Sequence, residues 1–318
     1  MRTPSIVRRP AHLAAAWTLL LATASCASSD RPFTEMATTV RDPAAPPDPA
    51  ADETPEAVHA FAAAPVEAAV ATHPAVRLDP PYTDCQRIAA GAAGTHPETT
   101  TQVLVRTVAW GDTVATVEVA ERIAGTWVCG TPMTGRVGRN GVRPLLERRS
   151  GDGTTPAGVF PLATMTAPDG QRFSFFGNSA DPGVTAGAYR RVQPGDCFGA
   201  TPGTAGYGHL RDDTSCPGPD DEYLPDFTAA YSNAALIGAN MEPNVSGDEP
   251  GEIPYASAIF LHRFTYVSGQ SGATKPTSGC VSLSQADLTS VLVALRPGAQ
   301  FVIGPTDWLL DQLDVSAG

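Results

Sequence analysis

The chain has 318 residues, enough for one large domain or two small ones. Its formal net charge at pH 7 is −12. Hydrophobic residues make up 42% of the chain, but after the N-terminus no segment reaches the roughly 18 consecutive apolar residues of a transmembrane helix. Non-specific nucleic-acid binding needs clustered Lys and Arg. We therefore expect no nucleic-acid partner, and we interpret the short basic run "LERRS", Leu146–Ser150, as a solvated or substrate-facing loop.

The N-terminus has the organisation of a secretory signal. Three arginines precede the apolar stretch "AHLAAAWTLLLATAS", which is too short to span a bilayer. Residues 1–26 are thus predicted to be a signal peptide, which makes the protein extracytoplasmic. "ATAS" followed by Cys26 resembles a bacterial lipobox and predicts a lipidated, membrane-anchored cysteine, whereas Ala22-Thr23-Ala24 suits ordinary signal peptidase and secretion to the cell wall.

Residues 27–81 are interpreted as a disordered tether. Ala, Pro, Asp and Glu dominate there, as in "RDPAAPPDPAADETPEA". Such a composition buries too little apolar area to offset the entropy of ordering, and frequent proline keeps it semi-extended. The folded domain is therefore expected over residues 82–318.

The cysteine count predicts two disulfides. Cysteines of an exported protein pair unless something else uses them, and if Cys26 carries lipid, one of the remaining five is left over. Cys197 and Cys216 bracket a loop rich in Gly, Asp and Pro, and Cys85 and Cys129 flank the first β-rich block. Cys280 would then be the single free thiol. The six cysteines are Cys26, Cys85, Cys129, Cys197, Cys216 and Cys280.

A zinc site at Cys197, His209 and Cys216 is the competing interpretation of that loop. These residues include no close-spaced ligand pair of the zinc-ribbon kind. In an oxidising compartment a disulfide is favoured, so we expect no metal and no cofactor.

The folded part begins with strands. "TQVLVRTVAW" and "TVATVEVAE", from Thr101, alternate β-branched residues and are separated by Gly111-Asp112, which predicts a hairpin. "TWVCG" predicts a third strand. Residues 182–254 are loop-rich and acidic, with one apolar portion, "AAYSNAALIGAN", that suits a strand or a short helix.

The C-terminal part predicts strand, helix and strand. "SAIFLHRF" places Ala258, Phe260 and His262 on one face of a strand. Ser284 is a plausible N-cap for an amphipathic helix that ends at Pro297-Gly298, and "AQFVIG" follows as a buried strand. The fold class is therefore mainly β with one late amphipathic helix. The apolar positions of that helix recur at helical spacing: Leu288, Val291, Leu292 and Leu295.

Cys280 and His262 form the one candidate catalytic pair. A nucleophilic cysteine needs a base and donors for the oxyanion that it creates, and "TSGC" supplies small residues whose backbone N–H groups can converge beside the sulfur. Each residue alone also has an ordinary structural interpretation, the histidine as a satisfied core residue and the cysteine as a buried one. The 14 residues between His262 and Thr277 make the pair informative.

That spacing resembles the signature of the YkuD-like L,D-transpeptidases, in which a His precedes a Ser/Thr-His-Gly-Cys run by 14 to 17 residues. "SGDGTTPAGVF" at Ser150–Phe160 resembles the family's "G-D-G-x-T-P-x-G-x-F" segment, and "VLVALRPGAQFVIG" resembles its closing helix and strand. The resemblance covers roughly Thr101 to Pro305 and implies the β-sandwich or barrel of that family. Ser278 replaces its usual His, and Ser282 replaces its usual Arg or Asn.

The resemblance implies a role for each site residue. Cys280 attacks the carbonyl of the third residue of a peptidoglycan tetrapeptide stem and releases the terminal D-alanine, while His262 receives the thiol proton. The backbone carbonyl of Arg263 orients the histidine ring, and the backbone N–H groups of Ser278, Gly279 and Cys280 stabilise the oxyanion. An amine of a second stem then forms a 3→3 cross-link, so the expected partners are donor and acceptor stems, acted on by a monomer.

Other functions remain open. A sortase-like enzyme needs an arginine near and downstream of the nucleophile, but the first here is Arg296, and papain-like and NlpC-type peptidases place Cys before His. A protein with the same fold could hydrolyse the acyl-enzyme as an L,D-carboxypeptidase. It could also be a disulfide-stapled cell-wall binding lipoprotein whose active site has been retired.

Overall fold

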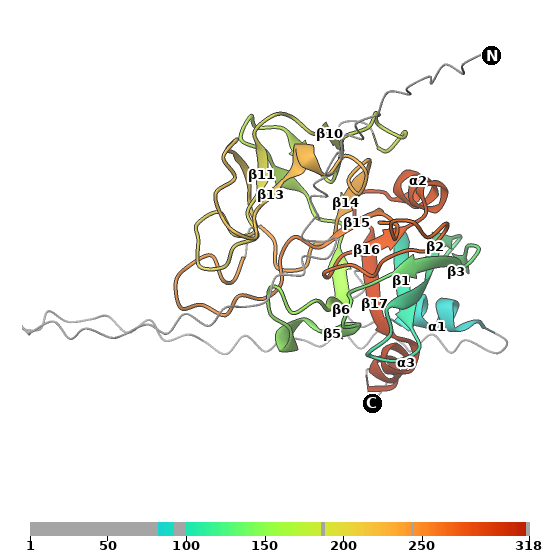
Figure 1. Cartoon of the computed structure of the whole chain (residues 1–318). Helices are drawn as coiled ribbons and strands as arrows, with labels where there is room; N and C mark the ends of the chain where they lie inside the picture. The colour runs from blue at the N-terminus through green and yellow to red at the C-terminus, as the bar shows by residue number, and fades with distance from the viewer. Residues whose placement is uncertain (1–81, 92–98, 186–187, 243–244, 316–318) are drawn as a thin grey trace, which may run out of the picture.

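The computed structural model describes residues 82–91, 99–185, 188–242 and 245–315 (Figure 1). The predicted signal peptide, lipobox and tether lie outside this part of the chain, and the chain that follows them is mainly β, as predicted. Among the described residues, no helix is long and apolar enough to cross a membrane.

One mixed sheet of twelve strands dominates the described chain. Its strands lie in the order β10 (Tyr189–Arg191), β9 (Phe175–Gly177), β14 (Ala234–Leu236), β15 (Phe260–Arg263), β16 (Val281–Leu283), β4 (Met133–Arg136), β2 (Val114–Ile123), β1 (Thr101–Thr107), β17 (Gln300–Pro305), β6 (Thr155–Pro161) and β5 (Val142–Pro144), with β3 (Thr126–Cys129) paired to β2.

The predicted N-terminal hairpin is confirmed. Strands β1 and β2 pair antiparallel, and β3 continues the meander on the far side of β2. The final strand, β17, then inserts between β1 and β6, parallel to the first and antiparallel to the second. The first strand of the described sheet and the last strand of the chain are therefore neighbours, near the β5 edge of the sheet.

The acidic segment 182–254 contains more regular structure than its composition predicts. β14 forms within the apolar portion. A separate three-stranded sheet comprises β12 (Leu210–Asp212), β11 (Asp196–Phe198) and β13 (Glu222–Tyr223). A 3-10 turn, Leu224–Asp226, follows β13; another, Leu145–Glu147, follows β5, and β7 (Met165–Thr166) pairs with β8 (Arg172–Phe173).

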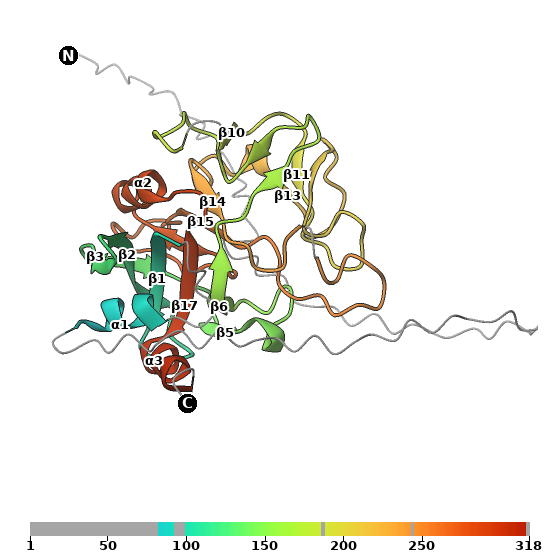
Figure 2. The same ribbon diagram turned by 180° about the vertical axis from the view of Figure 1, so that it is seen from behind.

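The late helix is confirmed as α2 (Gln285–Ala294), but it is not the only one. The described chain also contains α1 (Asp84–Gly91) and α3 (Thr306–Val315). Figures 1 and 2 show α1 and α3 together at one end of the central strands and α2 near the other. Both were missed because they are short and are held by packing against the sheet rather than by a strong sequence pattern.

Ser284 caps α2 as the sequence predicts, because its hydroxyl accepts a hydrogen bond from the Asp287 N–H at 3.2 Å. Ser284→Ala is expected to lower the free energy of unfolding by about 1 kcal/mol, the usual cost of a lost N-cap. Urea denaturation measures it. Ser290→Ala, at an exposed position of the same helix, is the matched control and should stay within about 0.5 kcal/mol of wild type. Equal losses in the two variants would contradict the capping role.

Strand β15 separates two hydrophobic clusters. Ile259 and Leu261 pack in the cluster under α2 with Val281, whereas Phe260 lies in a second, aromatic cluster with Cys280. This alternation is the one predicted for "SAIFLHRF". It puts the candidate nucleophile on the same face of the sheet as the candidate base.

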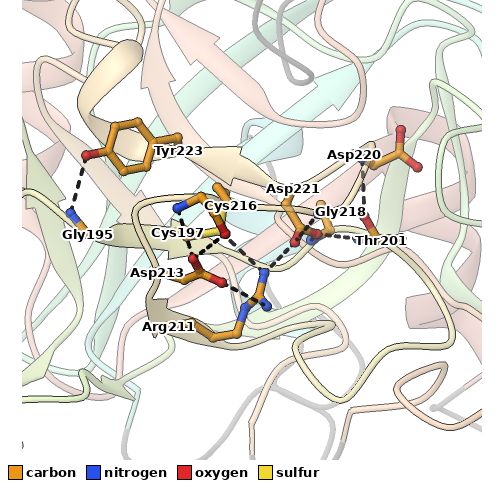
Figure 3. The surroundings of a disulfide bond; sticks show 12 residues. Gly195, Cys197, Thr201, Arg211, Asp213, Cys216, Gly218, Asp220, Asp221 and Tyr223 are labelled. Atoms are coloured by element: carbon orange, nitrogen blue, oxygen red, sulfur yellow. Dashed lines mark hydrogen bonds and ion pairs between the residues drawn. A yellow bond between two sulfur atoms is a disulfide. The ribbon is translucent and has the colours of Figure 1, made fainter.

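Both predicted disulfides are present. Cys85–Cys129 ties α1 to β3, with its Cα atoms 6.4 Å apart. Cys197–Cys216 joins β11 to the loop that follows β12 (Figure 3). The side chain of Arg211, beside the second bridge, contacts the carboxylate of Asp221. The cysteines of the competing zinc interpretation are thus joined to each other.

Candidate functional site

Two neighbouring parallel strands bring the candidate pair together. In the β15–β16 ladder His262 lies opposite Ser282, and Leu261 lies opposite Val281. Residues opposite each other in a ladder point to the same face, and faces alternate along a strand. Cys280, two residues before Ser282, therefore shares the face of His262.

His262 is fully buried, and only one of its ring nitrogens is engaged. Nδ1 lies 2.7 Å from the Arg263 carbonyl oxygen, as the family resemblance implies. A carbonyl only accepts, so Nδ1 carries the hydrogen and Nε2 is left as an acceptor. Within the described part of the chain, Nε2 is buried without a hydrogen-bond partner.

Burial lowers the pKa of His262 to about 4, although the Arg263 carbonyl opposes the shift. The imidazole is therefore neutral at pH 7 and can accept a proton. Its ring packs edge-on against Tyr231, with centroids 5.5 Å apart. The Tyr231 hydroxyl donates to Glu222 at 2.5 Å, and burial followed by the Glu222 charge raises the pKa of that phenol well above its usual value.

Cys280 is also fully buried. Its sulfur lies 3.4 Å from the Phe260 N–H nitrogen and 3.4 Å from the Ala258 carbonyl oxygen. Ala258 has a positive φ of 56°, which is costly for a residue with a side chain and clusters at functional sites.

The expectation that Cys280 is a free thiol is wrong for this structure. Cys280 is disulfide-bonded, and the other four described cysteines pair with each other. The prediction removed Cys26 from the count through lipidation. All six cysteines form an even set, and in an oxidising compartment every one of them can be paired. Nucleophilic chemistry therefore requires Cys280 to be reduced first.

Two threonines hold the carbonyl group of Cys280. The Thr277 hydroxyl donates to it at 2.6 Å and the Thr155 hydroxyl at 3.3 Å. Thr155 in turn accepts the Gly138 N–H at 2.8 Å. The "TTP" segment, the "GRN" turn and the cysteine loop are therefore fixed to one another.

Gly279 is required at its position. Its φ is +151°, and a Cβ would lie 3.0 Å from the Thr154 carbonyl oxygen and 3.3 Å from Arg148 Nη2. Of the three backbone donors expected for an oxyanion, the Gly279 N–H is already engaged by the Thr277 hydroxyl at 3.2 Å. In this conformation it is not offered to a substrate.

Two arginines contact the residues that precede Cys280. Arg139 is exposed, and its Nη1 donates to the Ser278 hydroxyl at 3.0 Å. Arg148 reaches the loop from the protein interior, beside Gly279. The basic run of Arg148 and Arg149 was predicted to be a solvated or substrate-facing loop. Arg149 is exposed, which fits the solvated alternative, whereas Arg148 is 1% exposed, so the prediction is wrong for it.

Arg148 has one carboxylate partner. Its Nη2 lies 3.3 Å from Asp152 Oδ1, and burial lowers the pKa of the guanidinium to about 10 while Asp152 opposes the shift. Burial alone would raise the pKa of Asp152, but the charge of Arg148 and the hydrogen bonds from Thr154 and Arg149 hold it below its usual value.

The remaining predicted residues take simpler places. Ser282 is buried, and its hydroxyl has no hydrogen-bond partner within the described ranges. His209 pairs with Glu242 at 2.5 Å. Arg263 contributes its backbone carbonyl to His262, and its side chain lies over the Tyr266 ring.

The comparison with known families decides the identity of the domain. The model of the YkuD family, the L,D-transpeptidase catalytic domain, matches residues 113–303, more than half of the chain. The chain belongs to the YkuD family. A search of curated proteins found no match. The matched segment of this YkuD domain contains His262, Cys280 and both threonines around the cysteine loop.

Three residues of this YkuD site were missed from the sequence. Thr155 lies in the quoted "SGDGTTPAGVF" block and Thr277 in "TSGC". Both were therefore within motifs that the sequence singled out, but no function was predicted for either side chain. Arg148 carried no signal, because a buried and an exposed arginine side by side in "ERRS" look alike in sequence.

Proposed function

We propose that the protein is an exported, cysteine-dependent L,D-transpeptidase that acts on peptidoglycan tetrapeptide stems in the cell wall. Membership of the YkuD family supports the type of enzyme and the peptidoglycan substrate. The observation that carries the proposal is the buried, neutral His262, whose Nε2 is an open acceptor on the face of the sheet that also bears Cys280.

The first half-reaction forms a thioester. His262 Nε2 takes the proton of the reduced Cys280 thiol, and the sulfur attacks the carbonyl carbon of the third stem residue. The bond to the terminal D-alanine breaks, and its amine leaves with the proton held by His262. Both side chains are fully buried in the structure, so neighbouring segments have to move before a stem can reach the sulfur.

The second half-reaction returns the free enzyme. An amine of a second stem attacks the thioester carbonyl, gives its proton to His262 and releases the thiol, which leaves a 3→3 cross-link. Water in place of the amine would give L,D-carboxypeptidase activity instead. The two outcomes share the first half-reaction, so product analysis has to separate them.

A catalytically retired cell-wall protein is the second candidate. One observation favours it: Cys280 is disulfide-bonded, and a sulfur in a disulfide cannot attack a carbonyl. Under this candidate the disulfide is permanent.

Incubation of reduced protein with a tetrapeptide donor and a diaminopimelate-bearing acceptor tests the proposal. We expect a cross-linked dimer and one D-alanine per dimer by mass spectrometry, and neither product from Cys280→Ala. D-Alanine without dimer would replace transpeptidation by carboxypeptidation. No product from reduced wild type would support the retired protein. Arg149→Gln, an exposed change near the site, should match wild type.

A further inference from the structure

Arg148 is a buried cation whose hydrogen bonds are incompletely satisfied. It is 1% exposed, and in the described chain its only carboxylate contact is Asp152, at 3.3 Å. Nε and Nη1 are buried with no hydrogen-bond partner there. Unmade hydrogen bonds to a buried charge cost stability and call for an explanation in a native structure. A simple structural role would use these donors.

The guanidinium contacts the cysteine loop at Gly279, on the side of the loop that also faces Ile259. Nη2 is 3.3 Å from where a Cβ on Gly279 would stand, so only the absence of that Cβ lets the cation rest against the backbone. Gly279 is joined to Cys280 by one peptide unit. Asp152, which contacts Arg148, also orders the Gly151–Thr154 turn, because its carboxylate accepts the Arg149 and Thr154 N–H groups at 2.8 Å.

The other charged groups around the loop do not supply a buried positive charge. His262 is neutral at pH 7 because burial lowers its pKa to about 4. Burial raises the pKa values of Tyr207 and Tyr231, the two tyrosines near the loop. Arg139 is exposed, where solvent screens its charge. The titratable and charged groups on the segments packed here are Arg139, Arg148, Asp152, Tyr207, Glu222, Tyr231 and His262.

We propose that Arg148 is a positioning residue whose buried positive charge stabilises the thiolate of reduced Cys280 and the oxyanion that forms beside it. The inference rests on the proposed role of Cys280 as the nucleophile. A cation near a cysteine favours its thiolate, and the effect is strong where solvent is excluded. Here the neutral His262 removes the proton, and Arg148 supplies the charge that keeps the sulfur ionised.

The guanidinium remains charged under working conditions. Burial lowers the pKa of Arg148 to about 10, which is still well above neutrality. Asp152 neutralises it only in part, because the contact is long and a single nitrogen makes it. Substitutions of Arg148 and of Asp152 should therefore change the electrostatic potential at the cysteine loop in opposite directions. Removing the arginine makes the loop less positive, and removing the carboxylate makes it more positive.

The test is the pH dependence of Cys280 alkylation by iodoacetamide in reduced protein, followed by peptide mapping. Below the pKa of a thiol, each unit of pKa changes the thiolate fraction tenfold. We expect Arg148→Gln to slow alkylation about tenfold at low pH and Asp152→Asn to speed it several-fold. The rate at the high-pH plateau reports access to the sulfur, so a change in midpoint separates charge from exposure.

Two control variants make the result decisive. Arg148→Lys keeps a charge and should keep most of the low-pH rate, and Arg149→Gln, the exposed neighbour, should stay within about twofold of wild type. A merely structural role predicts that Arg148→Gln and Asp152→Asn change the rate in the same direction. That result, or an equal effect of Arg149→Gln, overturns the inference. If Arg148→Gln does not fold, the direction of Asp152→Asn decides.

The outcome is separable from that of the proposed function. Alkylation needs only a thiolate and no stem peptide. Opposite shifts in the two variants without any stem transfer would leave the charge effect standing and refute the transpeptidase. Stem transfer with alkylation midpoints insensitive to Arg148 and Asp152 would refute the inference alone.

Discussion

Reduced protein mixed with a carbapenem is expected to gain the mass of one drug molecule, and Cys280→Ala is expected to gain none. The family resemblance implies this reaction. The strained lactam carbonyl stands in for the stem carbonyl, and ring opening leaves an acyl-thioester that water removes slowly. The His262 acceptor on the same face of the sheet supplies the base for the attack. Intact-protein mass spectrometry measures the change.

Reduction is the internal control for this experiment. Cys280 is disulfide-bonded in the structure, so protein that has not been reduced should take up no drug. Peptide mapping must place the adduct on Cys280 rather than on a thiol released from Cys85–Cys129 or Cys197–Cys216. Equal uptake by wild type and Cys280→Ala would refute the nucleophile. Uptake without reduction would instead show that the thiol is free in solution.

The folded domain is expected to lose about 3 kcal/mol of stability through His262 as the pH falls from 6.5 to 4. Burial depresses the pKa of the folded-state imidazole to about 4, against 6.5 when unfolded. Between these values the unfolded chain binds a proton that the folded chain excludes. The stabilisation is therefore complete above pH 6.5 and is lost as the pH falls to about 4.

Urea denaturation at intervals across this range tests the prediction as a difference between variants. His262→Gln keeps a side chain of similar size that does not titrate, so its stability should fall less on acidification, by about the same 3 kcal/mol. His209→Gln, at the partly exposed histidine that pairs with Glu242, is the matched control for removing a histidine. Parallel curves for wild type and His262→Gln would show that the histidine is not buried neutral.

Much of the fold could be predicted because its signals are local. The β1–β2 hairpin follows from alternation and a Gly-Asp turn, and α2 from a Ser cap with apolar residues at helical spacing. Helices α1 and α3 and the small sheet of β11, β12 and β13 were missed. These elements are short, and their stability comes from the disulfides and from packing on distant strands.

The sequence alone determined the candidate pair of the site, His262 and Cys280. The distance between His262 and Cys280 along the chain could be read from the residues themselves, and the resemblance to the YkuD family implied the order of the three motif blocks and the Arg263 carbonyl behind the histidine. The two domain disulfides followed from which loops the cysteines flank. Each of these properties depends on neighbours in the chain, which a single sequence displays.

Only the tertiary structure decided the environment of those residues. The β15–β16 register places His262 beside Ser282, and burial makes that histidine neutral. Packing buries Arg148 and exposes Arg149. In the structure Cys280 is disulfide-bonded rather than a free thiol. Burial, register and residual charge arise from segments far apart in the chain. A pattern of residue types does not encode them, because one side chain can be solvated or desolvated by what folds over it.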